Sequence, residues 1–223
     1  MRLTEADQAR VSAAVTQAEL GTDGEIVTVV AGRSDAYHDV ALHWAVLAML
    51  LVLALLAWQP QVVEWLHVRL VDSWSQTVPP RWYLTVALIL IAATFLLVRV
   101  VLALDKLRML LTPGATKARR VHARALALFR TAAEKRTKAS TGVLLYLSLA
   151  EHRAEIIADE AIHSKVAPEV WGEAMAALIA EVKQDRPGEG MAQAVAKVGE
   201  VLATHFPRSE GDTNELPDRL IIL

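Results

Sequence analysis

Two long apolar runs constrain this chain more than any other feature of its sequence. The first run, residues 40–58, contains no charged side chain. The second, residues 82–98, is also uncharged and continues past Arg99 to residue 104. A helix needs roughly 20 apolar residues to cross a hydrocarbon layer about 30 Å thick. We therefore expect a transmembrane hairpin with spans at about 40–58 and 82–104 and an outer loop at 59–81.

Two other interpretations of these runs are weaker. A signal peptide follows a basic N-terminal stretch, whereas the first run begins roughly 40 residues in, after an acidic segment. A buried core helix explains either run alone, but a chain of 223 residues cannot bury two such helices on all sides. Tryptophan placement favours the hairpin, because indole rings prefer the headgroup level of a bilayer. Five of the six tryptophans lie at or between the ends of the runs: Trp44, Trp58, Trp65, Trp74 and Trp82.

The outer loop and the two polar residues of the spans favour an anchor over a pore. Apolar residues recur in the loop at near-helical spacing, which predicts a helix lying along the membrane surface. Arg99 and His43 would suit an ion path, since intramembrane charges are costly. Both lie near a span end, where snorkelling or solvation is the simpler interpretation, and two spans alone form no pore. The loop residues with helical spacing are Val62, Val63, Trp65, Leu66, Leu70 and Val71.

The net charge of −2 hides a segregation of charge along the chain. Subtracting acidic from basic residues gives −4 for residues 1–40, 0 for 41–98, +9 for 99–138 and −7 for 139–223. Lysine and arginine concentrate in the cytoplasmic flanks of membrane spans. The basic block follows the second span, so this charge pattern predicts that both termini are cytoplasmic.

The basic block has two candidate partners. Anionic headgroups are its nearest counter-charges if the preceding run crosses a bilayer. Nucleic-acid binding is the competing interpretation, but the block lacks interleaved exposed aromatic residues and an adjacent acidic segment would repel a polyanion. We therefore expect the lipid bilayer as a partner and no nucleic acid. The residues expected at the membrane surface are Lys106, Arg108, Lys117, Arg119 and Arg120.

The remaining segments predict one α/β domain interrupted by the hairpin. One early strand cannot form a core with a single helix, whereas three strands and four helices can form an α/β/α layered sandwich with a small mixed sheet. We expect residues 1–39 and 117–207 to share this domain, with a linker at 105–116 and a C-terminal tail at 208–223 that is polar and then closes with apolar residues 220–223. The predicted elements are helices at 4–19, 117–136, 169–183 and 190–205 and strands at 25–31, 142–149 and 154–158, the last two forming an antiparallel hairpin. We expect Thr4 to be the N-cap of the first helix. The expected inner faces of the second and third helices are Val121, Ala125, Leu128 and Phe129, and Val170, Trp171, Ala174, Leu178 and Val182.

Several short motifs border these predicted strands. Residues 22–26 (TDGEI) precede the first strand, residues 141–145 (TGVLL) begin the second, and an E-x-R-x-E-I-I-A-D element covers residues 151–159. Together they resemble the TPM domain, an α/β/α module of plant thylakoid-lumen and photosystem-repair proteins and of many bacterial membrane-attached proteins. The end of the chain is similar to the bacterial membrane branch of that family. The positions that carry the resemblance are Gly24, Glu25, Thr141, Gly142, Glu151, Arg153 and Asp159.

The resemblance implies functions that composition and periodicity do not. It implies Ca²⁺ or Mg²⁺ binding in some members, phosphatase activity in some plant relatives, and roles in maintaining membrane complexes. Bacterial relatives often occur alongside LemA-like membrane proteins, so we expect a bacterial inner-membrane protein with a membrane protein partner of this kind. The inserted hairpin departs from the usual plan, in which a signal peptide places the domain outside the cytoplasm.

Carboxylates at predicted strand ends are the candidates for chemistry. Asp159 and Glu160 follow the third strand and Asp23 precedes the first, and hard cations prefer carboxylate oxygens. A divalent-cation site formed by these three residues is one interpretation. Solvated loop carboxylates, with Glu25 paired to Arg153, are the other.

No catalytic residue is assigned, because recognised catalytic motifs are missing from the sequence. It contains no cysteine, which excludes disulfides and thiol nucleophiles, and it has no P-loop, nucleophile-elbow serine or H-E-x-x-H motif. We therefore expect a non-enzymatic, membrane-anchored protein that binds a partner, and a divalent cation, in membrane-protein maintenance. The alternative is a metal-dependent phosphatase that uses Asp159, Glu160 and Asp23.

Overall fold

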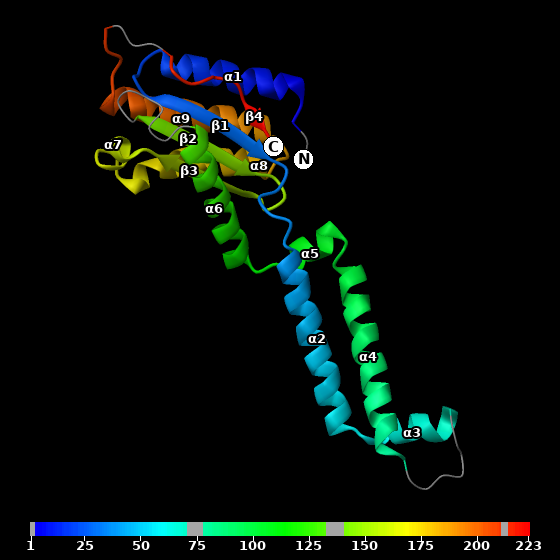
Figure 1. Cartoon of the computed structure of the whole chain (residues 1–223). Coiled ribbons are helices and arrows are strands. Elements are labelled where there is room, and N and C mark those ends of the chain that lie inside the picture. Colours follow the sequence, from blue (N-terminus) through cyan, green and yellow to red (C-terminus); the bar gives the residue numbers. More distant parts are fainter. Residues whose placement is uncertain (1–2, 71–77, 133–140, 211–213) are drawn as a thin grey trace. The chain divides into compact units, whose positions relative to one another are not determined.

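The described part of the chain divides into two units. The computed structural model describes residues 3–70, 78–132, 141–210 and 214–223 (Figure 1). Met1–Asp35 and Pro113–Leu223 form the first unit, and Ala36–Thr112 form the second. Two segments far apart in the sequence therefore build one α/β unit, and the apolar runs lie in the other.

A four-stranded mixed sheet forms the centre of the first unit. Its strands are β1 (Glu25–Ala31), β2 (Gly142–Ser148), β3 (Arg153–Ala158) and β4 (Ile221–Ile222), in the order β3-β2-β1-β4. β1 runs parallel to β2 and to β4, whereas β3 pairs antiparallel with β2. The three predicted strands and the predicted antiparallel hairpin are thus confirmed.

The apolar end of the predicted tail forms a strand, which the sequence did not predict. Val29 and Val30 of β1 pair with Ile221 and Ile222, and the N–H of Leu223 donates to the carbonyl of Val30 (3.0 Å). A two-residue strand is too short to show an alternating pattern, so periodicity could not identify it.

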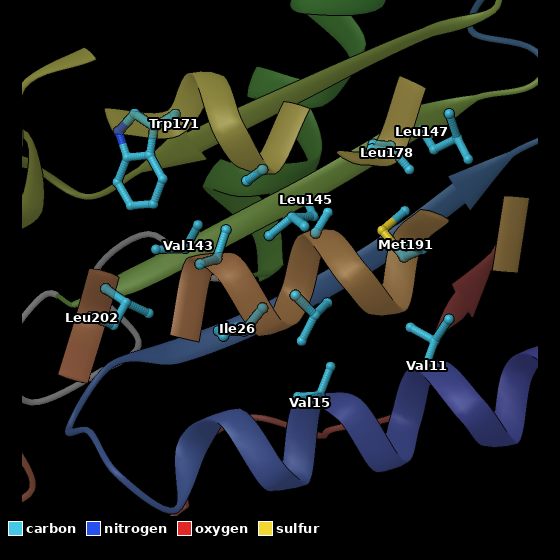
Figure 2. Packing of buried hydrophobic residues seen from close by; sticks show 14 of the residues in the cluster. Val11, Val15, Ile26, Val143, Leu145, Leu147, Trp171, Leu178, Met191 and Leu202 are labelled. Atoms are coloured by element: carbon cyan, nitrogen blue, oxygen red, sulfur yellow. The ribbon is translucent and has the colours of Figure 1, made fainter. Parts of the chain in front are cut away.

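One face of the sheet is covered by three helices. They are α1 (Glu5–Glu19), α8 (Gly172–Val182) and α9 (Pro187–His205). Figure 2 shows α9 between α1 and the strands, with Met191 and Leu202 directed into the cluster. Side chains alternate between the faces of a strand, so every second apolar residue of β1 and β2 contributes here. These strand residues are Ile26, Val30, Val143, Leu145 and Leu147.

The opposite face is covered by α6 (Gly114–Ala132). Val121, Ala125 and Phe129 recur at helical spacing and are buried, which confirms the predicted inner face of this helix. They pack with the other set of strand residues, including Leu144 and Tyr146. Helices on both faces of a mixed sheet confirm the α/β/α layered sandwich. The predicted helix end at residue 136 lies outside the described residues.

The N-terminus of α1 has the predicted cap. The Thr4 hydroxyl accepts from the N–H of Asp7 (3.2 Å), and the Asp7 carboxylate accepts from the N–H of Thr4 (3.0 Å). This reciprocal pair satisfies donors that a helix start leaves open. The bond from the Thr4 backbone, together with that from its hydroxyl, lowers the pKa of Asp7 from its ordinary value.

The predicted helix at 169–183 begins later than expected. Residues Pro168–Trp171 form a 3₁₀ turn, η1, and the α-helix starts at Gly172. Trp171, Ala174, Leu178 and Val182 are buried as predicted, but Val170 is 41% exposed. The tighter 3₁₀ turn shifts Val170 out of the helical phase that would have directed it inward. A further short helix, α7 (Glu160–His163), follows β3 and was not predicted.

The second unit contains both apolar runs as helices. They are α2 (His38–Trp58) and α4 (Pro80–Val101), which pack against each other. Between them lies α3 (Gln61–Leu70), which contacts the start of α4: the indole N–H of Trp82 donates to the carbonyl of Val63 (3.3 Å). Trp74 and Val71 of the predicted loop pattern lie outside the described residues. The predicted linker contains an additional helix, α5 (Asp105–Leu111).

Candidate functional site

The predicted acidic residues meet at one edge of the sheet. Glu25 pairs with Gly142 where β1 and β2 begin, and Val143 pairs with Ala158 where β3 ends. Since β3 runs antiparallel to β2, its end lies beside the beginnings of the other two strands. Asp23 and Asp159 therefore lie at the same edge, a convergence that the sequence could not establish.

Two of the predicted carboxylates, Asp23 and Asp159, accept a hydrogen bond from a backbone amide. Asp159 is buried, and its Oδ2 accepts from the N–H of Gly142 (3.1 Å), while its own N–H donates to the carbonyl of Gly142 (2.9 Å). Asp23 Oδ1 accepts from the N–H of Ser209 (2.7 Å), and Glu160 is exposed on α7. Across the described residues, no three His, Asp or Glu side chains are grouped so that they could hold a metal ion.

Glu25 connects the chain end to the start of the sheet. Its buried carboxylate accepts from the N–H groups of Glu215 (3.1 Å) and Leu216 (3.2 Å). The expected pairing of Glu25 with Arg153 is wrong, because the register places Arg153 opposite Ser148, at the other edge of the sheet. Most of the TPM-like motif positions at this edge thus make bonds that hold the strands and the chain end together.

A polar cluster that the sequence analysis missed lies at the opposite edge. It consists of Ser34, Tyr146, Ser148 and Glu151. The N–H of Ser34 donates to Glu151 Oε1 (2.9 Å), and the Ser148 hydroxyl donates to Glu151 Oε2. Ser34 Oγ lies 2.9 Å from both the Tyr146 hydroxyl and Ser148 Oγ.

This polar cluster fixes the segment that leaves β1. The cluster contains the buried Glu151, so its carboxylate charge is compensated by donors and not by water. The carboxyl ends of parallel strands are the usual ligand edge of an α/β sheet. Here donors within the domain already occupy both carboxylate oxygens. Glu151 is one of the TPM-like motif positions, and its place in that motif is the sequence signal that pointed to this cluster.

The predicted membrane-surface cations fall into two groups. Arg120 pairs with Asp35, and Arg108 is only 8% exposed, with its guanidinium bonded to Asp105 and to the carbonyl of Leu102 (3.2 Å). The expected surface position of Arg108 is therefore not observed. Lys106 and Arg119 are exposed, and Lys117 is half-buried. Across the described residues these three cations make no ion pair, so they are available to an external anion.

An acidic hollow of about 280 Å³ lies on the domain surface near η1, α8 and α9. Its charged residues are Glu169, Glu173, Glu200 and Lys197, and its apolar residues are Val170 and Val201. Lys197 Nζ lies 3.3 Å from Glu200 Oε2 and 3.9 Å from Glu173 Oε2. One cation thus lies within ion-pair distance of two of the three carboxylates, and the exposed Val170 and half-buried Val201 lie beside them.

The first unit is an α/β/α sandwich in which buried carboxylates hold strand ends together. In the comparison with known families, residues 100–201 match the model of the TPM domain. The match includes the motifs at residues 141–145 and 151–159 and so confirms their resemblance to that domain. The match leaves out α1 and β1, which the structure places in the same unit as β2 and β3.

One solved structure supports the same fold. It is the NMR structure of the BA42 protein from the psychrophilic bacterium Bizionia argentinensis, with 17% sequence identity and a TM-score of 0.57. The comparison covers 100% of this chain and 97% of that chain. At this level of identity the likeness concerns the fold alone. No curated protein matches the chain.

Proposed function

We propose that this protein is a TPM domain anchored in the bacterial inner membrane by α2 and α4, with both termini in the cytoplasm. In this proposal the domain is non-enzymatic and binds a membrane protein partner during membrane-protein maintenance. The observation that carries the proposal is the large apolar surface that the two long helices leave exposed.

The dimensions of the two helices support insertion. α2 has 21 residues and α4 has 22, and both have a mean hydropathy of 2.6 over their most apolar window. At a rise of about 1.5 Å per residue each spans roughly 32 Å, close to the thickness of a hydrocarbon core. Only 17% and 6% of those windows are buried, which supports insertion over a role as core helices of a soluble protein. Exposed leucines such as Leu50 and Leu88 would otherwise face water.

Cysteine labelling tests the anchor and its orientation, because the natural chain has no cysteine. Gln61→Cys, on α3, should react with a membrane-impermeant maleimide added outside intact spheroplasts. Glu173→Cys, on the domain, should react only after the membrane is opened. This result is expected because Lys and Arg are concentrated after α4 and sparse between the spans. The reverse labelling would contradict the orientation, and release of the protein by alkaline carbonate would contradict insertion.

The acidic hollow supports binding of a basic, partly apolar protein segment. The resemblance to bacterial TPM-domain proteins suggests a LemA-like membrane protein as the partner to test. Charge reversal of Glu173 and Glu200 should weaken co-purification of that partner at least tenfold, because two attractive charges become repulsive. Glu160→Lys is the matched control, since it reverses an exposed acid away from the hollow. Equal binding by wild type and the double variant would exclude this hollow as the partner site.

The cation and phosphatase hypotheses both concern Asp23, Asp159 and Glu160. Two of these carboxylates already bind backbone amides, which favours the non-enzymatic proposal. We expect wild type and Asp159→Asn to hydrolyse a phosphomonoester at the same background rate with Mg²⁺ or Ca²⁺ present. A metal-dependent rate that the variant loses would instead establish the phosphatase. Calorimetric titration with Ca²⁺ tests binding separately: heat in wild type that Asp159→Asn loses would support a cation site.

A further inference from the structure

The short helix α5 exposes a row of leucines on one side. Leu110 is 76% exposed and Leu104, just before the helix, is 60% exposed. Leu107 and Leu111 are also exposed, and the spacing of the four residues places them on one helical face. Lys106 and Arg108 flank this face on its two sides, and Lys106 is exposed whereas Arg108 is buried. Helix α5 is therefore amphipathic, but its apolar side faces outward from its unit.

Hydrogen bonds fix α5 to the ends of both long helices. The Arg108 guanidinium donates to the carbonyl of Leu102, where α4 ends, so the chain turns there with its last carbonyls satisfied. The indole N–H of Trp44, in the second turn of α2, donates to the carbonyl of Leu111 (3.1 Å). The Thr112 hydroxyl also donates to the carbonyl of Arg108 (2.7 Å). The position of α5 within the second unit is thus set by α2 and α4.

We propose that α5 is an interfacial membrane helix whose leucine face inserts at the boundary between headgroups and acyl chains. The proposal rests on the membrane anchor proposed above. Val100 and Val101, at the end of α4, are also exposed, so exposed apolar residues follow one another along the chain from the span into α5. A lipid leaflet covers these valines and the leucine face together, and Lys106 at the rim of the face can reach anionic headgroups.

The buried Arg108 makes this geometry specific. A surface arginine would place its charge in water, but here the guanidinium turns inward and holds the chain between α4 and α5. The leucines are thereby presented on the outside.

Helix α3 lies between the other ends of the two long helices and exposes Val62 and Trp65. The hairpin would then have one interfacial helix at each end, which fixes its depth in the bilayer.

Spin-label accessibility in lipid-only nanodiscs tests the proposal with the full chain. Single labels are placed at Leu107→Cys and Leu110→Cys on α5, at Leu50→Cys and Leu88→Cys in the spans, and at Glu173→Cys as the aqueous reference. We expect the two α5 labels to collide several-fold more with oxygen, relative to a water-soluble nickel chelate, than the Glu173 label does. The nanodiscs contain phosphatidylglycerol and no other membrane protein.

The outcomes separate this proposal from the membrane anchor. If the α5 labels resemble the Glu173 label while the span labels report lipid, α5 is not interfacial and the anchor stands. If the span labels also report water, the anchor itself fails. If the α5 labels are protected only in native membranes, a protein covers the leucine face and the lipid proposal is overturned.

Discussion

Gly199→Val should lower the free energy of unfolding of the α/β unit by about 1–3 kcal/mol, the usual range for an overpacked core. Gly199 lies within α9, where the helix passes against α1. A Cβ atom at this position would lie 2.6 Å from the Cβ of Ala18, closer than carbon atoms can approach. The backbones of α1 and α9 would have to move apart, which would open the core around Val15 and Val198.

Gly172→Ala is the matched control for Gly199→Ala, which introduces the same close contact with the smallest side chain. Its Cβ would meet no atom within 4 Å, at the first residue of α8. Replacing a helical glycine by alanine normally stabilises by up to about 1 kcal/mol. We expect Gly172→Ala to be neutral or stabilising and Gly199→Ala to destabilise, although propensity alone predicts the same sign for both. Hydrogen exchange of the β1 and β2 amides in detergent measures the effect, and stabilisation by Gly199→Ala would contradict the packing argument.

Glu151→Leu should lower the free energy of unfolding by about 2–3 kcal/mol. The variant removes the acceptor for the hydroxyl of Ser148, which is buried, and for the N–H of Ser34, which is half-buried. The Ser148 hydroxyl loses this bond without recovering water, which is the costly way to break a hydrogen bond. Exchange at the Ser34 amide should rise most, because Glu151 is its acceptor.

Glu151→Gln and Glu155→Gln separate the network from simple loss of charge. Glu151→Gln retains an acceptor oxygen, so it should cost less than Glu151→Leu. Glu155 is partly exposed and pairs with His122 at 3.1 Å, so its substitution should cost below about 1 kcal/mol. Equal effects of Glu151→Leu and Glu155→Gln would show that the buried network contributes nothing specific.

The sequence predicted the features that depend on neighbouring residues. Short apolar runs, β-branched in the first strand, placed β1, β2 and β3 closely, and the helical spacing of Val121, Ala125 and Phe129 identified the inner face of α6. The capping box at Thr4 and Asp7 was also predictable, because it needs only the local order of side chains. The 3₁₀ turn η1 was not predictable, because the same residue types are favoured at the start of a 3₁₀ turn and of an α-helix.

The candidate site was less predictable, because it depends on strand register. Motif positions pointed to Asp159 and Glu151, but not to their bonding partners. Asp23 and Asp159 share an edge because β3 returns antiparallel to β2, and the same register separates Glu25 from Arg153. Ser34 follows β1 by three residues, and only its approach to the β2–β3 turn reveals the polar cluster around Glu151.

By itself, the sequence determined the class of fold, the TPM-like motifs and the two long apolar helices. These features follow from composition and periodicity within short windows of sequence, because they depend on interactions between residues that are close along the chain. Tertiary structure alone decided that Ile221 and Ile222 complete the sheet, that Gly199 permits close helix contact, and that Arg108 turns inward so that α5 exposes its leucines. Each of these depends on residues brought together by folding, and no local pattern specifies such contacts.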